Sequence, residues 1–293
     1  MTTSFHQALR AGRILFFDGA MGTMLAAREG ARGVDVSITK PLTSLAVHAA
    51  YRKAGADVLI TNTFDANRQM LSDAGTRTLL RFACAGACED ARDAAGPQGF
   101  VAGDIGPTGE LLEPYGTMTE AAMRAAFEET ARLLAAGGVD LFVIETMSDT
   151  REMTLAVEAC RAAAKELPIA ASMAFDPSRQ GGFRTSMGVS PTDAARAMAA
   201  AGADILGANC GAITPEQMAE VVREFRRASN LPILAQPNAG LPELRAGQAV
   251  FSLSPESFAA GMMQVIAAGA RLLGGCCGTT PAHIAALVAA TKK

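Results

Sequence analysis

The chain of 293 residues contains no tryptophan, and its aromatic content is only 5%. It also lacks an excess of positive charge, because its formal net charge is −3. Nucleic-acid-binding proteins usually present a basic surface and aromatic side chains on which bases stack. The composition therefore argues against nucleic acid as a partner, and it gives no basic surface for an anionic membrane.

Long apolar runs are missing as well. The first residues, Met1–Arg13, contain no apolar segment typical of a secretory signal. No uninterrupted apolar run approaches the roughly 20 residues that a membrane helix needs. We therefore expect a cytoplasmic protein with no membrane partner. Cysteines stay mostly reduced in that compartment, so the six cysteines predict metal ligands, nucleophiles or core residues rather than disulfides.

Short apolar stretches rich in β-forming residues alternate with alanine-rich stretches of helical periodicity, such as Glu120–Ala136, Arg151–Glu166 and Glu216–Ala228. Eight stretches predict strands: Ile14–Phe17, Asp57–Phe64, Phe100–Ile105, Asp140–Met147, Ile169–Phe175, Asp204–Cys210, Ile233–Gln236 and Arg271–Cys276. Eight buried strands that alternate with helices predict a single (β/α)8 TIM-type barrel spanning residues 1–293. A doubly wound open sheet is the alternative.

The ends of the predicted helices carry recognisable signals. A capping hydroxyl precedes a proline at Ser190-Pro191, Thr214-Pro215, Ser254-Pro255 and Thr280-Pro281. Two pairs have the spacing of a capping box, Thr214 with Gln217 and Thr117 with Glu120. Glycines that can end a helix in a left-handed conformation recur in Ala54–Asp57, Gly137–Asp140, Ala201–Asp204 and Ala268–Arg271.

Polar and cysteine residues gather where the predicted strands end. They are Asp18, Asn62, Asp104, Glu145, Cys210, Asn238, Cys276 and Cys277. Active sites of TIM barrels are built at the carboxyl ends of the strands. These positions therefore predict the functional site.

Three of the cysteines form the most informative group. Cys210 ends the sixth predicted strand, Cys276 ends the eighth and Cys277 follows it, and each has a glycine on one side. Strands six and eight are separated only by strand seven in a closed barrel. Three thiolates at an open mouth match a tetrahedral zinc ion with one position left for a substrate, the arrangement of a catalytic site.

The charge of such a site indicates its chemistry. Three thiolates on Zn²⁺ leave a net charge of −1, so the metal would be a poor activator of water or carbonyls. It can still bind a thiol as thiolate near neutral pH, where only a few per cent of a free thiol is ionised. The site therefore favours S-alkylation.

Other roles for the cysteines stay open on spacing alone. Cys276 and Cys277 can be two buried apolar residues or a strained vicinal disulfide, and Cys210 can be core packing. A cysteine-based redox or metal-binding protein is the corresponding alternative function. For Cys84, Cys88 and Cys160 we favour packing.

Seven motifs then reveal a resemblance: DGAMGT (Asp18–Thr23), TNTF (Thr61–Phe64), GDIGPTG (Gly103–Gly109), IET (Ile144–Thr146), GANCG (Gly207–Gly211), QPNAGLP (Gln236–Pro242) and GGCCGTTPAHI (Gly274–Ile284). In this order they resemble the homocysteine S-methyltransferase family. The resemblance is strongest to the N-terminal homocysteine-binding module of cobalamin-dependent methionine synthases.

The resemblance implies zinc on Cys210, Cys276 and Cys277 and homocysteine as substrate. It implies that backbone N–H groups of Gly22 and Thr23 bind the substrate carboxylate and that Glu145 pairs with its ammonium. Asp18 either supports that end of the pocket or braces its own loop.

The asparagines at the strand ends and Asp104 have less definite roles. Asn209, like Asn62 and Asn238, either hydrogen-bonds the substrate or braces the zinc loops, and we favour bracing. We expect Asp104 to cap the turn Gly106–Gly109.

The methyl donor is the least determined part of the prediction. None of the histidines lies in the D-x-H-x-x-G context of a corrinoid-binding module, and there is no second barrel for methylfolate. We expect methylcobalamin on another module or protein as the donor, with a methylfolate-binding module as a further partner. Direct use of betaine or S-methylmethionine is the alternative.

Overall fold

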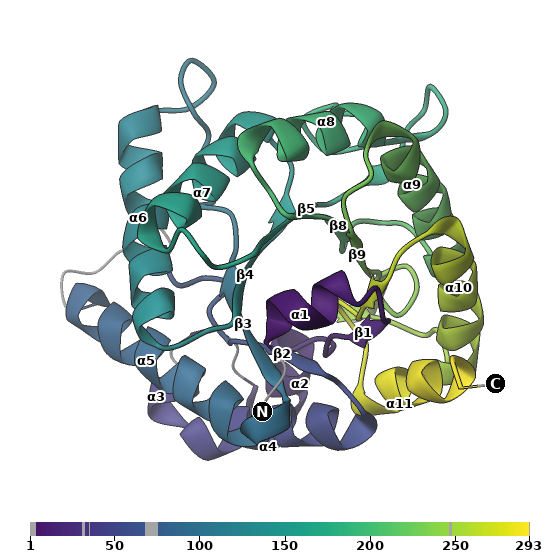
Figure 1. Cartoon of the computed structure of the whole chain (residues 1–293), viewed down its shortest axis with the longest axis horizontal. Coiled ribbons are helices and arrows are strands. Elements are labelled where there is room, and N and C mark those ends of the chain that lie inside the picture. Colours follow the sequence, from purple (N-terminus) through teal and green to yellow (C-terminus); the bar gives the residue numbers. More distant parts are fainter. Residues whose placement is uncertain (1–3, 31–32, 35, 68–75, 246–247, 293) are drawn as a thin grey trace.

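The computed structural model describes residues 4–30, 33–34, 36–67, 76–245 and 248–292. Eight parallel strands form one sheet in the order β1-β12-β9-β8-β5-β4-β3-β2. Their bounds are β1 (Leu15–Phe16), β2 (Val58–Ile60), β3 (Phe100–Ile105), β4 (Leu141–Met147), β5 (Ile169–Met173), β8 (Ile205–Asn209), β9 (Ile233–Gln236) and β12 (Leu272–Leu273). A parallel bridge between Phe17 and Val58 joins the two end strands. The sheet thus closes into a TIM-type barrel, which confirms the predicted fold (Figure 1).

Helices surround this barrel on the outside (Figure 1). The helices that follow β1 are α2 (Gly22–Glu29), α3 (Val36–Thr39), α4 (Pro41–Ala54), α5 (Thr76–Ala95), α6 (Glu120–Ala136), α7 (Thr150–Ala163), α8 (Pro191–Ala201), α9 (Pro215–Ala228), α10 (Pro255–Ala268) and α11 (Pro281–Ala290), with a short 3-10 helix η1 (Gly96–Gln98). None of the helices in the described ranges combines the length and the apolar character that crossing a bilayer demands.

A further helix, α1 (Phe5–Arg10), lies across the opening of the barrel (Figure 1). Its Phe5 and Ala8 are buried against the first residues of the strands, including Leu15 and Leu141. The ring of Phe5 packs edge-on against Phe100 with ring centroids 5.4 Å apart. This apolar packing closes the amino-terminal end, so the site must lie at the opposite, carboxyl end of the strands.

The capping hydroxyls predicted before prolines are in place, since Ser190, Thr214, Ser254 and Thr280 are the N-caps of α8, α9, α10 and α11. The capping box of Thr214 with Gln217 is also confirmed. The predicted box of Thr117 with Glu120 is wrong, because Thr119 caps α6 and accepts from Ala122 N–H. Met118 still pairs with Leu112 in the preceding loop, so the helix starts only after it.

The glycines that follow the helices end them as expected. Gly55, Gly202 and Gly269 adopt the left-handed conformation after α4, α8 and α10. After α6 the left-handed residue is Gly138, with φ of 74°. Each turn returns the chain to the start of the next strand.

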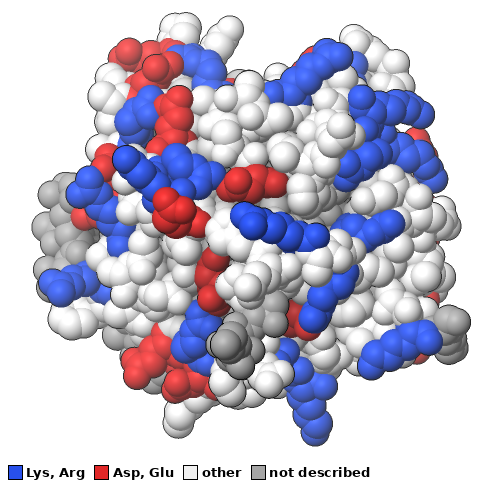
Figure 2. All heavy atoms as spheres, viewed as in Figure 1, with Lys and Arg blue, Asp and Glu red and all other residues white. Residues whose placement is uncertain are grey.

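An aspartate directly before the second, fourth and sixth strands of the barrel, β2, β4 and β8, ties neighbouring strands together. The carboxylates of Asp57, Asp140 and Asp204 accept from backbone N–H groups of β1, the β3 residue Val101 and the β5 residue Ile169. Each also pairs with an arginine: Asp57 with Arg13, Asp140 with Arg92 and Asp204 with Arg161. On the face where α1 lies, positive and negative side chains are accordingly intermingled (Figure 2).

Several predicted strands run too far toward their carboxyl ends. The second predicted strand, Asp57–Phe64, ends in the structure at Ile60. The eighth, Arg271–Cys276, ends at Leu273. In both cases the extra residues are loops that form the site. Two small antiparallel sheets lie in the loops after β5 and β9 and were not predicted from the sequence pattern. They are β6–β7 (Asp176–Pro177, Phe183–Arg184) and β10–β11 (Glu243–Arg245, Gln248–Val250).

Candidate functional site

The structure brings the three predicted cysteine ligands together. Cys210 directly follows β8, and Cys276 and Cys277 lie in the loop after β12. Their sulfur atoms all lie within 4.8 Å of one another, and the Sγ atoms of Cys210 and Cys277 are 4.0 Å apart. All six cysteines are free, and Cys84, Cys88 and Cys160 are buried in the core as predicted.

The backbone turns sharply at the first of these ligands. Cys210 adopts a left-handed conformation with φ of 56°, which is uncommon for a residue other than glycine. Gly211 follows with φ of 70°, where a side chain would collide with the backbone of Phe175. The Asn238 side chain donates to the Gly211 carbonyl at 2.8 Å. Asn238 thus braces the loop that carries Cys210 and Gly211, and bracing is the role favoured for it.

The pKa values of the three thiols are shifted in different directions. Hydrogen bonds from the other two thiols, from Gly211 N–H and from Asn238 lower the pKa of Cys210. The pKa values of Cys276 and Cys277 are raised, chiefly because their thiols donate to Cys210. The arrangement thus favours the thiolate form at Cys210, and a cation that replaces the thiol protons would meet three sulfur donors.

A cavity of about 290 Å³ opens beside the cysteines. Its wall carries the three cysteines, the loop Gly19–Thr23 and the carboxylates of Asp65, Asp104 and Glu145. Apolar surface comes from Met21, Ile60 and Phe64. The cavity thus has three cysteine sulfurs, the amino terminus of a helix and acidic side chains on its walls. Its volume admits a small amino acid.

The amino terminus of α2 forms one wall of this cavity. Gly22 and Thr23 are its first residues, and both line the cavity. No side chain caps this end, and its first turn has no acidic residue. Uncapped N–H groups and the positive end of the helix dipole favour an anion such as a carboxylate. Gly22 and Thr23 thus line the cavity at a helix amino terminus, and their contact with a carboxylate stays a prediction.

Glu145, near the end of β4, is the predicted ammonium partner and lines the cavity. Burial, and then the nearby Cys210 thiolate, raise its pKa to about 7. The next residue, Thr146, has φ of 61°. It is held there by Asn209, which is fully buried and lies outside the cavity lining. Asn209 therefore braces the chain beside Glu145, which is the role favoured for it over substrate contact.

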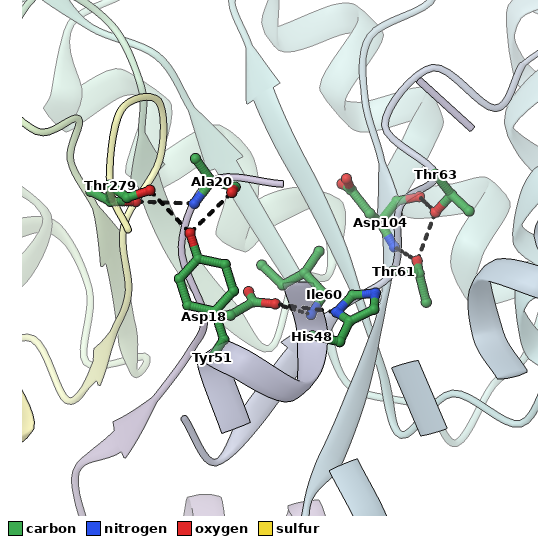
Figure 3. Close-up of polar contacts among 9 residues, drawn as sticks. All are labelled: Asp18, Ala20, His48, Tyr51, Ile60, Thr61, Thr63, Asp104 and Thr279. Atoms are coloured by element: carbon green, nitrogen blue, oxygen red, sulfur yellow. Dashed lines mark hydrogen bonds and ion pairs between the residues drawn. The ribbon is translucent and has the colours of Figure 1, made fainter. Parts of the chain in front are cut away.

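Asp18 lies behind the cavity wall rather than on it. Its Oδ2 accepts from Ile60 N–H at 3.0 Å and lies 3.9 Å from Nδ1 of the buried His48 of α4 (Figure 3). Burial raises the pKa of Asp18 and lowers that of His48 to about 4, and both shifts favour a neutral pair. Asp18 thus supports the end of β2, and its role at the substrate end of the pocket stays a prediction.

The expectation that Asp104 caps the turn after β3 is wrong. Asp104 lines the cavity, and its Oδ1 is buried without a partner among the described residues. The turn is held instead by Glu152 of α7, whose Oε1 accepts from both N–H and Oγ1 of Thr108. Glu152 is distant in sequence, so no local spacing revealed it.

The backbone of Asp104 is fixed by two threonines of the TNTF motif. Its N–H donates to Oγ1 of Thr61, and its carbonyl accepts from Oγ1 of Thr63 (Figure 3). Asn62, between them, donates to the Gly33 carbonyl and to Ser37 Oγ, which is again a bracing role. The motif therefore presents Asp104 to the cavity as a second carboxylate near Glu145. Burial is the main cause that raises the pKa of Asp104, and the negative charge of Glu145 raises it further.

A model of the family described as homocysteine S-methyltransferase matches residues 15–291, nearly the whole chain. The chain belongs to the homocysteine S-methyltransferase family. It is accordingly a homocysteine methyltransferase, and its three clustered cysteines are a candidate zinc site.

Two curated relatives in this homocysteine S-methyltransferase family are much longer. The chain is 33% identical to the methionine synthase of Mycobacterium tuberculosis over 95% of its own length and 24% of that protein. It is 31% identical to the methionine synthase of Mycobacterium leprae over 97% of its own length and 25% of that protein. The chain thus spans about a quarter of the length of these relatives.

A solved homocysteine methyltransferase is similar in size. The metallated form of MmuM from Escherichia coli has a TM-score of 0.76 and 27% identity, covering 97% of this chain and 98% of that one. The apo form has a TM-score of 0.73. Carboxyl transferase domains of pyruvate carboxylase from Rhizobium etli have 16% identity and a TM-score of 0.53 or 0.51, and they share the fold alone.

Proposed function

We propose that this homocysteine methyltransferase binds one zinc ion through Cys210, Cys276 and Cys277 and converts homocysteine to methionine. The methyl group would come from methylcobalamin carried by another module or protein. The observation that carries the proposal is the clustering of three sulfurs, within 4.8 Å of one another, on the wall of a cavity that also holds a helix amino terminus and carboxylates.

The residues present fit a zinc ion. Three sulfur donors are the soft ligands that zinc shares with few other ions, and they leave one tetrahedral position free. Asn238 donates to the Gly211 carbonyl and so holds the loop that carries Cys210 in place. When bound, zinc would supply the positive charge that lets a thiol lose its proton near neutral pH.

The chain's own residues would hold the amino-acid end of homocysteine. The free N–H groups at the start of α2, at Gly22 and Thr23, would take its carboxylate. Glu145 would pair with the ammonium, and a substrate ammonium would in turn lower the pKa of Glu145 from the raised value of the empty cavity. The carboxylate of Asp104, which also lines the cavity, offers a second acceptor for that ammonium.

Binding of the carboxylate and the ammonium of homocysteine would orient the substrate sulfur toward the open side of the cavity. With the amino-acid end held, the sulfur need only reach the cysteine cluster, and its lone pair can face a donor arriving from the mouth. Transfer then forms the S–CH3 bond of methionine while the bond between the methyl group and its carrier breaks. Orientation of this kind is where a methyltransferase gains most of its rate.

The choice of donor rests on the relatives. Two methionine synthases align with this chain over only a quarter of their length, so most of each of those proteins lies outside the aligned segment. A corrinoid-binding module and a methylfolate-binding module would be the partners of this barrel. A second candidate is direct use of betaine or S-methylmethionine, favoured by the match to nearly all of the single-barrel MmuM chain.

One experiment tests the zinc site and distinguishes the two candidate sources of the methyl group. Purified protein is analysed for zinc and then incubated with homocysteine and, separately, methylcobalamin, betaine or S-methylmethionine. The proposal expects one zinc per chain and methionine only with methylcobalamin. Methionine formed from betaine or S-methylmethionine would establish the second candidate. A protein without tight zinc and without proton release on adding homocysteine would instead be a cysteine-based redox or metal-binding protein.

A further inference from the structure

A buried hydroxyl joins two loops that line the proposed substrate cavity, the loop before α2 and the loop after β12. Oγ1 of Thr279 accepts from the N–H of Ala20 at 3.0 Å and donates to the carbonyl of Cys276 at 2.7 Å. Ala20 belongs to the loop that leads into α2, and Cys276 is one of the sulfur ligands. One side chain thus links the carboxylate-binding end of the cavity to the metal-binding end.

Tyr51 of α4 strengthens this link from behind. Its hydroxyl lies 3.0 Å from the carbonyl of Ala20 and 3.0 Å from the carbonyl of Thr279 (Figure 3). A second tether runs from the N–H of Gly278 to Oγ1 of Thr23 at 3.3 Å. Both loops are therefore joined at several points, by groups that come from three separate parts of the chain.

The junction is closely packed as well as hydrogen-bonded. Thr279 and Tyr51 are fully buried. A methyl group at Gly19 or at Gly275 would lie 2.5 Å from Oγ1 of Thr279, closer than carbon and oxygen can approach. The two glycines allow the two loops to approach each other closely, and a fully packed contact of this kind resists sliding.

We propose that Thr279 is a positioning residue that fixes the separation between the carboxylate-binding N–H groups and the sulfur cluster, and so selects homocysteine over cysteine. This inference rests on the proposed function. Cysteine has one methylene fewer between its sulfur and its amino-acid group. With the separation held, cysteine cannot reach both ends at once, whereas loops free to move could close on the shorter thiol.

Binding to the zinc-loaded protein, measured by titration calorimetry, tests this proposal. The probes are homocysteine, cysteine and 2-mercaptoethanol, a thiol with no amino-acid group. Thr279→Val removes the hydroxyl while keeping the shape of the side chain, and leaves the Ala20 N–H unpaired. We expect homocysteine to bind about tenfold more weakly to it. Binding of 2-mercaptoethanol and the zinc content should be unchanged, and the preference for homocysteine over cysteine should shrink.

Two further variants serve as controls. Thr279→Ser keeps the hydroxyl and should restore the preference. Thr280→Val removes the neighbouring hydroxyl, which contacts His283 at the start of α11, and should lower stability without changing the preference. If Thr279→Val does not fold, Tyr51→Phe decides, because it keeps the buried ring and removes only the contacts to Ala20 and Thr279.

The outcomes separate the two proposals. A wild-type protein that binds homocysteine no better than 2-mercaptoethanol would contradict the proposed function. A wild-type preference that survives in Thr279→Val, or in Tyr51→Phe where that variant decides, would overturn the positioning role alone. Loss of zinc or of 2-mercaptoethanol binding in Thr279→Val would also overturn it, because Thr279 would then hold the metal ligands rather than the separation.

Discussion

The side chain of Asn209 holds Thr146 through two hydrogen bonds. Its Oδ1 accepts from the N–H of Thr146 at 2.8 Å, and its Nδ2 donates to Oγ1 of the same residue at 2.7 Å. This contact keeps Thr146 in the left-handed conformation directly after Glu145, while Asn209 itself directly precedes Cys210. The amide therefore couples the carboxylate proposed to bind the ammonium to the end of the strand that leads into Cys210, a candidate metal ligand.

Replacing Asn209 by alanine should disturb this arrangement. The N–H of Thr146 and the hydroxyl of Ser172, which also donates to Asn209, would lose their partner in the core. We expect the free energy of unfolding to fall by about 1–3 kcal/mol. Homocysteine binding should weaken about tenfold through the displaced Glu145, with the zinc content unchanged. Urea unfolding and calorimetry measure both, and the exposed Asn230→Ala is the control. Unaltered affinity in the alanine variant would contradict the coupling.

The three cysteine ligands should be individually essential. Cys210→Ser, Cys276→Ser and Cys277→Ser should each lose tight zinc and methyl transfer while circular dichroism shows an intact barrel, since two sulfurs hold the ion poorly. Cys84→Ala, at a buried cysteine of α5, is the matched control and should keep its zinc. Full activity in any one of the serine variants would remove that residue from the site.

Glu145→Gln should act on the substrate and not on the metal. Loss of a charge-assisted hydrogen bond to the ammonium should weaken homocysteine binding by about 1.5–3 kcal/mol. Binding of 2-mercaptoethanol, which has no ammonium, should not change. Glu110→Gln, at an exposed glutamate of the loop after β3, is the control. Equal affinity for homocysteine in wild type and Glu145→Gln would assign the ammonium to another group.

The buried His48 predicts a pH dependence of stability. Burial lowers its pKa from 6.5 to about 4. The unfolded chain therefore takes up a proton between these values that the native state does not, and stability falls as the pH falls through this window. The facing Asp18 has a raised pKa, which acts in the opposite direction, so a comparison with a variant is needed.

His48→Gln removes the titrating group and isolates its effect. Between pH 7 and pH 5, wild type should lose about 2 kcal/mol more of its unfolding free energy than this variant does. Urea denaturation at a series of pH values measures the difference. Parallel curves for the two proteins would show that His48 titrates normally in the native state.

Much of the fold could be predicted from the sequence because local signals mark the elements. β3 and β9 have the predicted bounds, and the hydroxyl-proline pairs mark four helix starts. The predicted bounds of strands and helices are wrong where contacts outside the predicted element determine where it begins or ends. Thr61–Phe64 have the composition of a strand but turn away because Thr61 and Thr63 bond the backbone of Asp104. Thr119, rather than Thr117, starts α6 because the preceding loop folds back on itself.

The candidate site shows the same division. The cysteines, Glu145 and the start of α2 could be found because they follow strands of a barrel whose carboxyl ends must converge. The groups that position them could not. Glu152 and Tyr51 act through hydrogen bonds to residues far along the chain, and nothing in the neighbouring sequence distinguishes them from ordinary helix residues. Thr279 lies within the motif Gly274–Ile284, but its contact with Ala20 depends on the closure of the barrel and could not be predicted.

X-ray absorption at the zinc edge, on protein with and without homocysteine, tests the central claim most directly. The account predicts three sulfur neighbours from Cys210, Cys276 and Cys277 in the free protein and four when homocysteine is present. A metal with fewer than three sulfurs, or a sulfur count that homocysteine leaves unchanged, would contradict it.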